Sequence, residues 1–100
     1  MNKQVAKAVE ERSQGLCEVC GGNYIVQFHH IVGGNGKRTQ HETVESVIAL
    51  CWHCHYGANG WHGQNSIPIK TTLRRELQDT YREQGHSEEE IRTMMGGRLY

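Results

Sequence analysis

The stretch LCWHCHYGANGWH, from Leu50 to His62, concentrates the reactive side chains of an otherwise polar chain. Its thirteen residues include two of the four cysteines, three of the seven histidines and both tryptophans. Thiols and imidazoles are typical ligands of transition metals in proteins. The stretch therefore indicates a metal site that residues elsewhere in the chain would complete.

The four cysteines form two pairs, each with two residues between its thiols. CEVC supplies the first pair, and CWHC supplies the second after thirty intervening residues. Two such pairs can direct four thiolates to one ion, which is typical of a closed, tetrahedral structural zinc site. A redox pair is the alternative, but neither pair lies in the βαβ pattern of thioredoxin-like motifs. The expected ligands of a structural Zn²⁺ are Cys17, Cys20, Cys51 and Cys54.

The length and composition of the chain favour such a metal ion. Of its 100 residues only 36% are hydrophobic, and the mean hydropathy is -0.70. We expect a single domain, residues 1–100, with a thin core, and chains of this size often add a metal or disulfides. A zinc ion that joins the two cysteine pairs would supply the missing stability.

The charges of the chain balance, with eleven basic and eleven acidic side chains. Proteins that bind nucleic acid through bulk charge are usually basic. Contact with DNA would therefore require a local cluster of positive charge or a bound cation. Lys37 and Arg38 in a glycine-rich loop are candidate phosphate contacts, and Arg74 and Arg75 are similar, although such charges are more commonly solvated.

The amino-terminal sequence MNKQVAKAVEERSQG lacks the apolar run of a signal peptide, and no segment of the chain predicts a membrane span. We expect an intracellular, cytoplasmic protein without membrane contact. Thiols stay reduced in that compartment, which disfavours disulfides.

Hydrophobic periodicity predicts an α+β protein with short elements. An apolar stripe at Leu73, Leu77 and Tyr81 predicts a helix, and Ser87 and Glu90 form a capping box at the start of another. The remaining elements follow from β-branched runs and i, i+3, i+4 spacing. The expected helices are 2–13, 52–59, 70–84 and 87–95, and the expected strands are 24–32 and 47–50.

The histidines indicate a second site beside the cysteines. His29 and His30 are adjacent on a predicted strand, so their side chains point to opposite faces. One could bind a metal while its neighbour handles a proton; a core histidine beside a solvent-exposed one is the alternative. His55 follows the last cysteine, and Asn59 and His62 lie four and seven residues further on, where both could share its helix face.

The segments CEVC, FHHIV and SVIALCWHCHYGAN resemble, in this order and spacing, the HNH endonucleases that carry a four-cysteine zinc site. The resemblance covers residues 10–62 and implies a ββα-metal (His-Me) finger, in which two strands and a helix hold one divalent cation. The expected fold is therefore α+β, a small zinc-stapled finger with flanking helices. Residues 63–100 lie outside the resemblance as a C-terminal helical extension. Small free-standing members of this family are often phage-borne.

The resemblance also implies roles for individual residues. His29 and His55 correspond to metal ligands, and His30 corresponds to the general base. Asn59 corresponds to the third ligand because it lies one helical turn after His55, and His62 is its competitor.

Ser46 stands where the family has its middle asparagine, which helps to hold the loop that orients the general base. A serine hydroxyl can form local hydrogen bonds but has a shorter reach than an amide. The departure predicts either reduced activity or a base that is oriented by the backbone.

The implied function is that of a metal-dependent DNA endonuclease with one divalent cation, Mg²⁺, Mn²⁺ or Ni²⁺, and DNA as partner. A non-catalytic zinc module that binds nucleic acid or protein is the alternative. Ser46 and the neutral charge favour that alternative, whereas the His29–His30 pair disfavours it. A homodimer, or a larger assembly in which the chain becomes active, also stays open.

Overall fold

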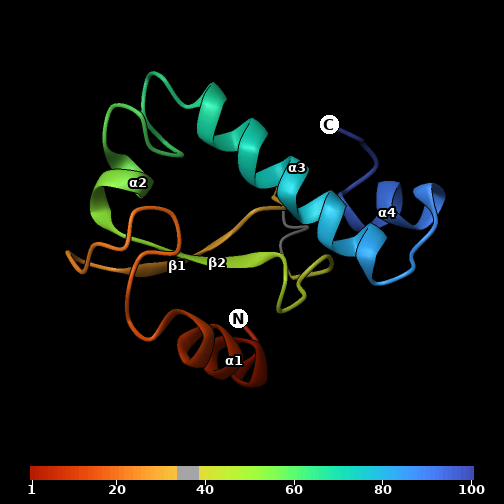
Figure 1. Cartoon of the computed structure of the whole chain (residues 1–100), viewed down its shortest axis with the longest axis horizontal. Coiled ribbons are helices and arrows are strands. Elements are labelled where there is room, and N and C mark those ends of the chain that lie inside the picture. The colour runs from red at the N-terminus through yellow and green to blue at the C-terminus, as the bar shows by residue number, and fades with distance from the viewer. Residues whose placement is uncertain (34–38) are drawn as a thin grey trace.

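The computed structural model describes residues 1–33 and 39–100 (Figure 1). The candidate phosphate contacts Lys37 and Arg38 lie outside these ranges. The described residues form a small α+β fold of four helices and one two-stranded antiparallel hairpin. In chain order the elements are α1 (Lys3–Ser13), β1 (Gln27–His30), β2 (Val47–Leu50), α2 (Trp52–Tyr56), α3 (Ile67–Glu83) and α4 (Glu88–Met94). None of these helices is long and apolar enough to cross a membrane.

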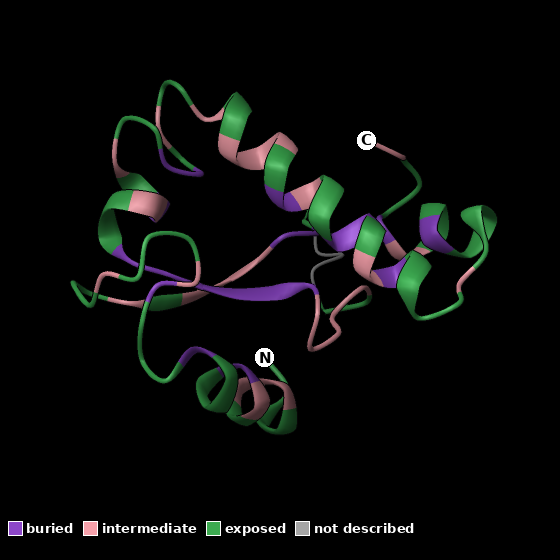
Figure 2. Cartoon of the chain, in the orientation of Figure 1, coloured by how far each residue is buried: buried purple, intermediate pink, exposed green. Residues whose placement is uncertain are grey.

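The hairpin is the middle layer of the molecule, between α1 on one side and α3 on the other (Figure 1). All of β2 is buried, as the purple strand in Figure 2 shows, because both of its faces are covered. Side chains alternate along a strand, so Val47 and Ala49 face α1 and pack against Val9. Ile48 and Leu50 point the other way, into a larger apolar cluster.

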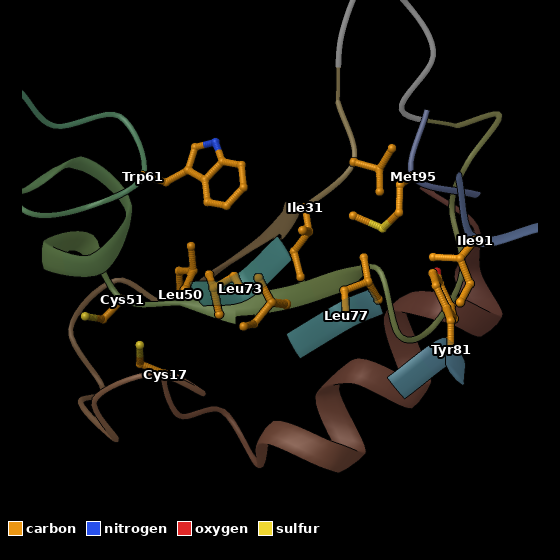
Figure 3. Packing of buried hydrophobic residues seen from close by; sticks show 12 residues of the cluster. Cys17, Ile31, Leu50, Cys51, Trp61, Leu73, Leu77, Tyr81, Ile91 and Met95 are labelled. Atoms are coloured by element: carbon orange, nitrogen blue, oxygen red, sulfur yellow. The ribbon is translucent and has the colours of Figure 1, made fainter. Parts of the chain in front are cut away.

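The larger cluster lies between the hairpin and the last two helices (Figure 3). Leu73, Leu77 and Tyr81 are all buried on α3, so the predicted stripe is the face that packs on the hairpin. Ile91 and Met95 fill the space beside them and are 0% and 4% exposed. The C-terminal segment thus contributes directly to the core that supports β2.

The capping box of α4 forms as predicted. Ser87 Oγ accepts a hydrogen bond from the Glu90 backbone N–H at 3.2 Å, and Glu90 Oε1 accepts one from the Ser87 N–H at 2.9 Å. These two bonds satisfy backbone donors that a helix start otherwise leaves without a partner.

The start of α3 and both ends of β1 differ from the predicted boundaries. The first strand covers Gln27–His30 rather than residues 24–32, because Ile25 has a φ of 48°, a left-handed conformation that interrupts extended backbone. Helix α3 begins at Ile67 rather than at residue 70. Pro68 lies in its first turn, where the missing N–H would have no intrahelical partner in any case.

Hydrogen bonds of Arg12 and Glu18 join α1 to the first cysteine pair and to β2. Arg12 of α1 donates to Glu18 Oε2 at 2.9 Å and to the carbonyl oxygen of Val47 at 2.6 Å. Glu18, which lies between Cys17 and Cys20, in turn exchanges hydrogen bonds with the backbone of Ala49: its N–H donates at 2.9 Å, and its carboxylate accepts at 3.0 Å. The loop that carries the first two thiols is therefore fixed to the hairpin.

Candidate metal centres

The four cysteines converge on one point. Their sulfur atoms all lie within 4.8 Å of one another, although the two pairs come from the loop after α1 and from the start of α2. A tetrahedral zinc site with bonds of about 2.3 Å would place its sulfurs about 3.8 Å apart. Cys20 Sγ and Cys51 Sγ lie 3.5 Å apart, and all four thiols are free of disulfides. The cluster fits a structural zinc ion.

The backbone of the first pair is shaped around its sulfurs. The Gly22 N–H points at Cys20 Sγ at 3.4 Å, and a Cβ at Gly22 would come within 3.3 Å of the same sulfur. Gly21 has a φ of 77°, which few other residues adopt. Both glycines therefore have a geometric role in the tight turn that presents the thiols.

The pKa values of two of the clustered thiols shift in opposite directions. Burial raises the pKa of Cys17, but hydrogen bonds from backbone N–H groups, first among them that of Cys20, outweigh burial and lower this pKa to about 7. Burial and the nearby sulfurs raise the pKa of Cys54. Four sulfurs this close cannot all carry a negative charge unless a cation balances them, which agrees with the geometric fit to zinc.

A second group of ligand atoms lies beside the hairpin. Ring nitrogens of His29, His55 and His62 all lie within 4.8 Å of one another, and this His triad could hold a metal ion. His29 comes from β1, His55 from α2 and His62 from the loop after α2. The separation between ring centroids is 5.0 Å for His29–His55, 5.5 Å for His29–His62 and 5.0 Å for His55–His62.

The environment of His55 suits a metal ligand. Burial, together with the positive charge that His62 can carry, lowers its pKa, so the ring is neutral and keeps a lone pair for an ion. Its Nδ1 atom is buried and has no hydrogen-bond partner within the described ranges. Because a buried polar atom without a partner is costly, an ion would relieve this cost. His62 is exposed, so the triad opens to the surface.

A glycine-rich loop brings His62 to the triad. Helix α2 ends at Tyr56, and the chain folds back so that the His62 N–H donates to the His55 carbonyl oxygen at 2.8 Å. A Cβ at Gly60 would lie 2.6 Å from the His53 carbonyl oxygen, and one at Gly63 would lie 2.0 Å from a carbonyl oxygen of the same loop. The fold-back therefore requires glycine at these positions.

The predicted reason for choosing Asn59 as a ligand does not hold in this structure. That reason required a helix from residue 52 to residue 59, but α2 stops at Tyr56 because Gly57 adopts an extended conformation with a ψ of 171°. Asn59 is exposed in the loop. His62, predicted as the competitor, lies with His29 and His55 in the triad, and the choice between His62 and Asn59 as third ligand stays a prediction.

His30 follows His29 on β1 and lines the same cleft, but its ring bonds to Glu42 rather than joining the triad. His29 is paired across the hairpin with Ile48, whereas His30 is paired with Val47, which faces α1. The His30 Nε2–H group donates to Glu42 Oε1 at 2.6 Å, and the side chains are 15% and 5% exposed. The remaining ring nitrogen, Nδ1, takes no part in this bond.

Glu42 is a site residue that the sequence did not reveal. Its second carboxylate oxygen accepts a hydrogen bond from the Asn2 backbone N–H at 2.9 Å. The Asn2 N–H, followed by His30, lowers the pKa of Glu42, so the carboxylate is ionised and acts as an acceptor toward the imidazole. The spacing of Glu42 and His30 in the sequence does not predict their contact. The contact depends on how the chain before β2 returns to the hairpin.

Ser46 stabilises that returning loop. It is 1% exposed, and its Oγ atom accepts from the Thr43 N–H at 2.8 Å and lies 3.1 Å from the Thr43 carbonyl oxygen. The Ser46 carbonyl oxygen accepts from the Ile31 N–H at 2.8 Å, next to His30. Within the described residues the Ser46 hydroxyl makes no hydrogen bond to His30, so its side chain acts on the turn that carries Glu42.

A cleft of about 770 Å³ lies beside the hairpin. The His triad and His30 line it from the hairpin and α2, and Trp61 lies beside them. Its other wall comes from the C-terminal part of the chain, which the sequence resemblance does not cover. The described residues of that wall include Arg74, Arg98 and Tyr100.

Comparison of the chain with models of known protein families, with curated proteins and with solved structures found no match. The structure itself shows a four-cysteine cluster and a His triad beside an antiparallel hairpin with flanking helices, and both clusters could bind a metal.

Proposed function

We propose that this protein is a metal-dependent DNA endonuclease of the HNH type, in which the hairpin and α2 act as the ββα-metal finger. One observation carries the proposal. A single cleft contains three histidines whose ring nitrogens lie within 4.8 Å of one another and a fourth, His30, whose Nε2 is bonded to a carboxylate. Hydrolysis of a phosphodiester bond requires such a combination of cation ligands and a base.

Two metal ions with separate roles fit the two clusters. The four thiolates would hold a structural Zn²⁺ that joins the loop after α1 to the start of α2, with no position open to water. His29, His55 and His62 would hold a catalytic divalent cation, which, when bound, neutralises charge that develops on the phosphate and on the leaving oxygen. Three imidazole ligands favour Mn²⁺ or Ni²⁺ over Mg²⁺, which prefers oxygen donors.

His30 is the general base in this proposal. Because the Nε2–H group is donated to Glu42, the neutral ring carries its lone pair on Nδ1. Nδ1 takes a proton from a water molecule, and the water oxygen forms a bond to phosphorus as the bond to the leaving sugar oxygen breaks. The leaving oxygen then takes a proton from solvent. Charge-bearing hydrogen bonds such as that to Glu42 stabilise the imidazolium that results.

Cleavage of supercoiled plasmid in the presence of Mn²⁺, Ni²⁺ or Mg²⁺ tests the proposal. Replacement of a general base typically lowers the rate about 10²–10⁴-fold, so His30→Ala should lose nearly all cleavage. Its zinc content and circular dichroism should stay those of the parent. His86→Ala is the matched control, because His86 lies between α3 and α4 and does not line the cleft. Equal cleavage by His30→Ala and the parent would reject His30 as the base.

A non-catalytic zinc module is the second candidate, and the net charge of zero favours it. It would contain zinc and would bind DNA or a protein partner, but no divalent cation would produce cleavage of the parent protein. The same plasmid assay therefore distinguishes the two functions.

A further inference from the structure

Among the described residues, basic side chains line the cleft and acidic side chains do not. The chain as a whole has equal numbers of basic and acidic residues. The described residues that line the cleft nevertheless include two arginines and four histidines, and no aspartate or glutamate. The two arginines, with no acidic side chain of the described residues beside them in the lining, give the cleft a positive local field although the protein has no net charge.

Arg74 and Arg98 contact aromatic rings, in contrast to the ion-paired arginines of the fold. Arg12 and Arg82 form ion pairs with glutamate or aspartate side chains. Neither Arg74 nor Arg98 forms an ion pair or a side-chain hydrogen bond with any residue in 1–33 or 39–100. Both arginines instead lie against aromatic rings at the wall of the cleft, and no aspartate or glutamate of the described residues pairs with their N–H donors.

The aromatic contacts hold Arg74 in place. Its Cζ atom lies 5.2 Å from the centroid of the Trp61 ring and 4.7 Å from that of the Tyr100 ring. A guanidinium that stacks on aromatic faces keeps the N–H groups at its edge available for a forked contact with an anion. The Trp61 ring is itself 4.5 Å from the ring of His29. A continuous set of ring contacts therefore leads from the His triad to Arg74.

A buried glutamine fixes the segment that carries Arg98. Gln78 of α3 is 1% exposed, and its side chain donates to the backbone O atom of Tyr100 at 3.1 Å and accepts from the Tyr100 N–H at 2.6 Å. With Tyr100 held in this way, Arg98 lies with its Cζ 5.4 Å from the Tyr100 ring. Both guanidinium groups thus lie against a ring whose backbone Gln78 holds, and such preorganisation lowers the entropic cost of binding.

We propose that Arg74 and Arg98 form a binding site for phosphate groups of the DNA strand that enters the cleft. The proposal rests on the proposed nuclease function and adds to it the C-terminal part of the chain. Forked guanidinium donors match the geometry of phosphate oxygens. They would hold the strand beside His30 and the His triad and would compensate for the absence of a net positive charge.

Binding of a fluorescently labelled DNA duplex, measured by anisotropy without added divalent cation, tests the proposal apart from catalysis. Loss of a charged hydrogen bond corresponds to a loss of affinity of about tenfold or more, which we expect for both Arg74→Ala and Arg98→Ala. The plot of log affinity against log salt should also become shallower by about one unit for each lost contact. Arg75→Ala is the matched control, since the neighbouring Arg75 is exposed and does not line the cleft.

Two further variants separate phosphate contact from folding. Arg74→Lys keeps the charge but loses the fork, so its affinity should fall while its salt slope stays close to that of the parent. Arg98 is exposed, so Arg98→Ala should leave the core and the zinc content intact. His30→Ala should bind DNA as the parent does, although it should not cleave.

The outcomes for the two proposals are distinct. A parent that binds DNA through Arg74 and Arg98 but never cleaves would reject the nuclease and keep the phosphate site. A parent that cleaves while Arg74→Ala and Arg98→Ala both bind as tightly as Arg75→Ala would overturn the phosphate site. A parent with no measurable affinity for the duplex would overturn it as well.

Discussion

The His30 ring can use only one nitrogen for chemistry, because Glu42 accepts a hydrogen bond from the other at 2.6 Å. Glu42 is in turn held by the Asn2 N–H at the start of α1. The position of the proposed base thus depends on a residue from the loop between the strands and on the amino-terminal helix. Glu42 is a positioning residue, since it acts through His30.

Replacing Glu42 by glutamine tests this role. A glutamine amide can rotate to donate to Nε2, which would move the lone pair away from Nδ1. Loss of such an orienting partner typically costs about 10–100-fold in activity, so kcat of Glu42→Gln should fall by this factor while KM changes little. Nitrogen NMR of the His30 ring should report a loss of the Nε2–H tautomer.

Glu45→Gln is the matched control for this substitution. Glu45 lies in the same loop, but its carboxylate accepts a hydrogen bond from Gln84 rather than from a histidine. Its kinetics and its His30 spectrum should be those of the parent. If Glu42→Gln retains both the parental tautomer and the parental kcat, Glu42 does not position the base.

The identity of the third metal ligand, His62 or Asn59, can be tested with single substitutions. We expect His62→Ala to raise the Mn²⁺ concentration needed for cleavage by more than tenfold, because an imidazole ligand is lost. Asn59→Ala should shift this concentration little, since Asn59 is exposed in the loop beyond α2. The measurement is a titration of plasmid cleavage with Mn²⁺ for each variant. A strong shift for Asn59→Ala alone would restore Asn59 as the ligand.

Among the elements, the short helix α2 and the loop after it have the greatest influence on the site. Five residues of helix carry His55, and three glycines then allow the backbone to return to the helix. The Trp61 N–H donates to the Cys54 carbonyl oxygen at 2.9 Å, and the next residue reaches His55 in the same manner. The four-cysteine cluster and the His triad therefore share one hydrogen-bonded turn of the chain.

Gly60→Ala should disturb the His triad and leave the four-cysteine cluster intact. The added Cβ would meet the backbone of His53 and Cys54 at 2.6–2.8 Å, so the loop must move and carry His62 with it. We expect weaker activation by Mn²⁺ with one zinc per chain retained, measured by cleavage titration and by elemental analysis. Gly33→Ala is a control for the unfolding free energy alone, because a Cβ there meets nothing within 4 Å but Gly33 lines the cleft. Unchanged Mn²⁺ activation in Gly60→Ala would show that the loop does not position His62.

For the whole molecule, the four-cysteine cluster joins the loop after α1 to the start of α2. One buried cluster extends from Cys17 near the start of the chain to Met95 near its end, and Cys51 lies within it. Only 36% of the chain is hydrophobic, so the core alone gives limited stability. A metal ion at the cysteines would link α1, the hairpin and α2 in a single cooperative unit.

Removal of zinc should therefore unfold the protein rather than only inactivate it. Binding energy at a structural zinc site is also folding energy. We expect Cys51→Ser, or treatment of the parent with a strong chelator, to abolish helical circular dichroism, and zinc addition to restore the chelated parent. Leu16→Ser is a suitable control, because Leu16 is 42% exposed beside the cluster. A folded, zinc-free protein with four reduced thiols would contradict the structural role.

The sequence by itself determined the features that depend on local spacing. The two Cys-x-x-Cys pairs, the buried stripe at Leu73, Leu77 and Tyr81, and the capping box at Ser87 all involve residues within a few positions of one another. Their physical causes, ligand geometry, helical periodicity and backbone capping, operate over one or two turns of chain. The α+β class and the two short strands followed from the same local signals.

Only the tertiary structure decided which distant side chains meet. Glu42 reaches His30 because the loop between the strands returns beside α1, and His62 joins the triad because glycines end α2 early. Arg74 faces Trp61 and Tyr100 because α3 packs across the hairpin. Such contacts depend on the packing of whole elements and on single steric conflicts between backbone atoms, and neither leaves a periodic signal in the sequence.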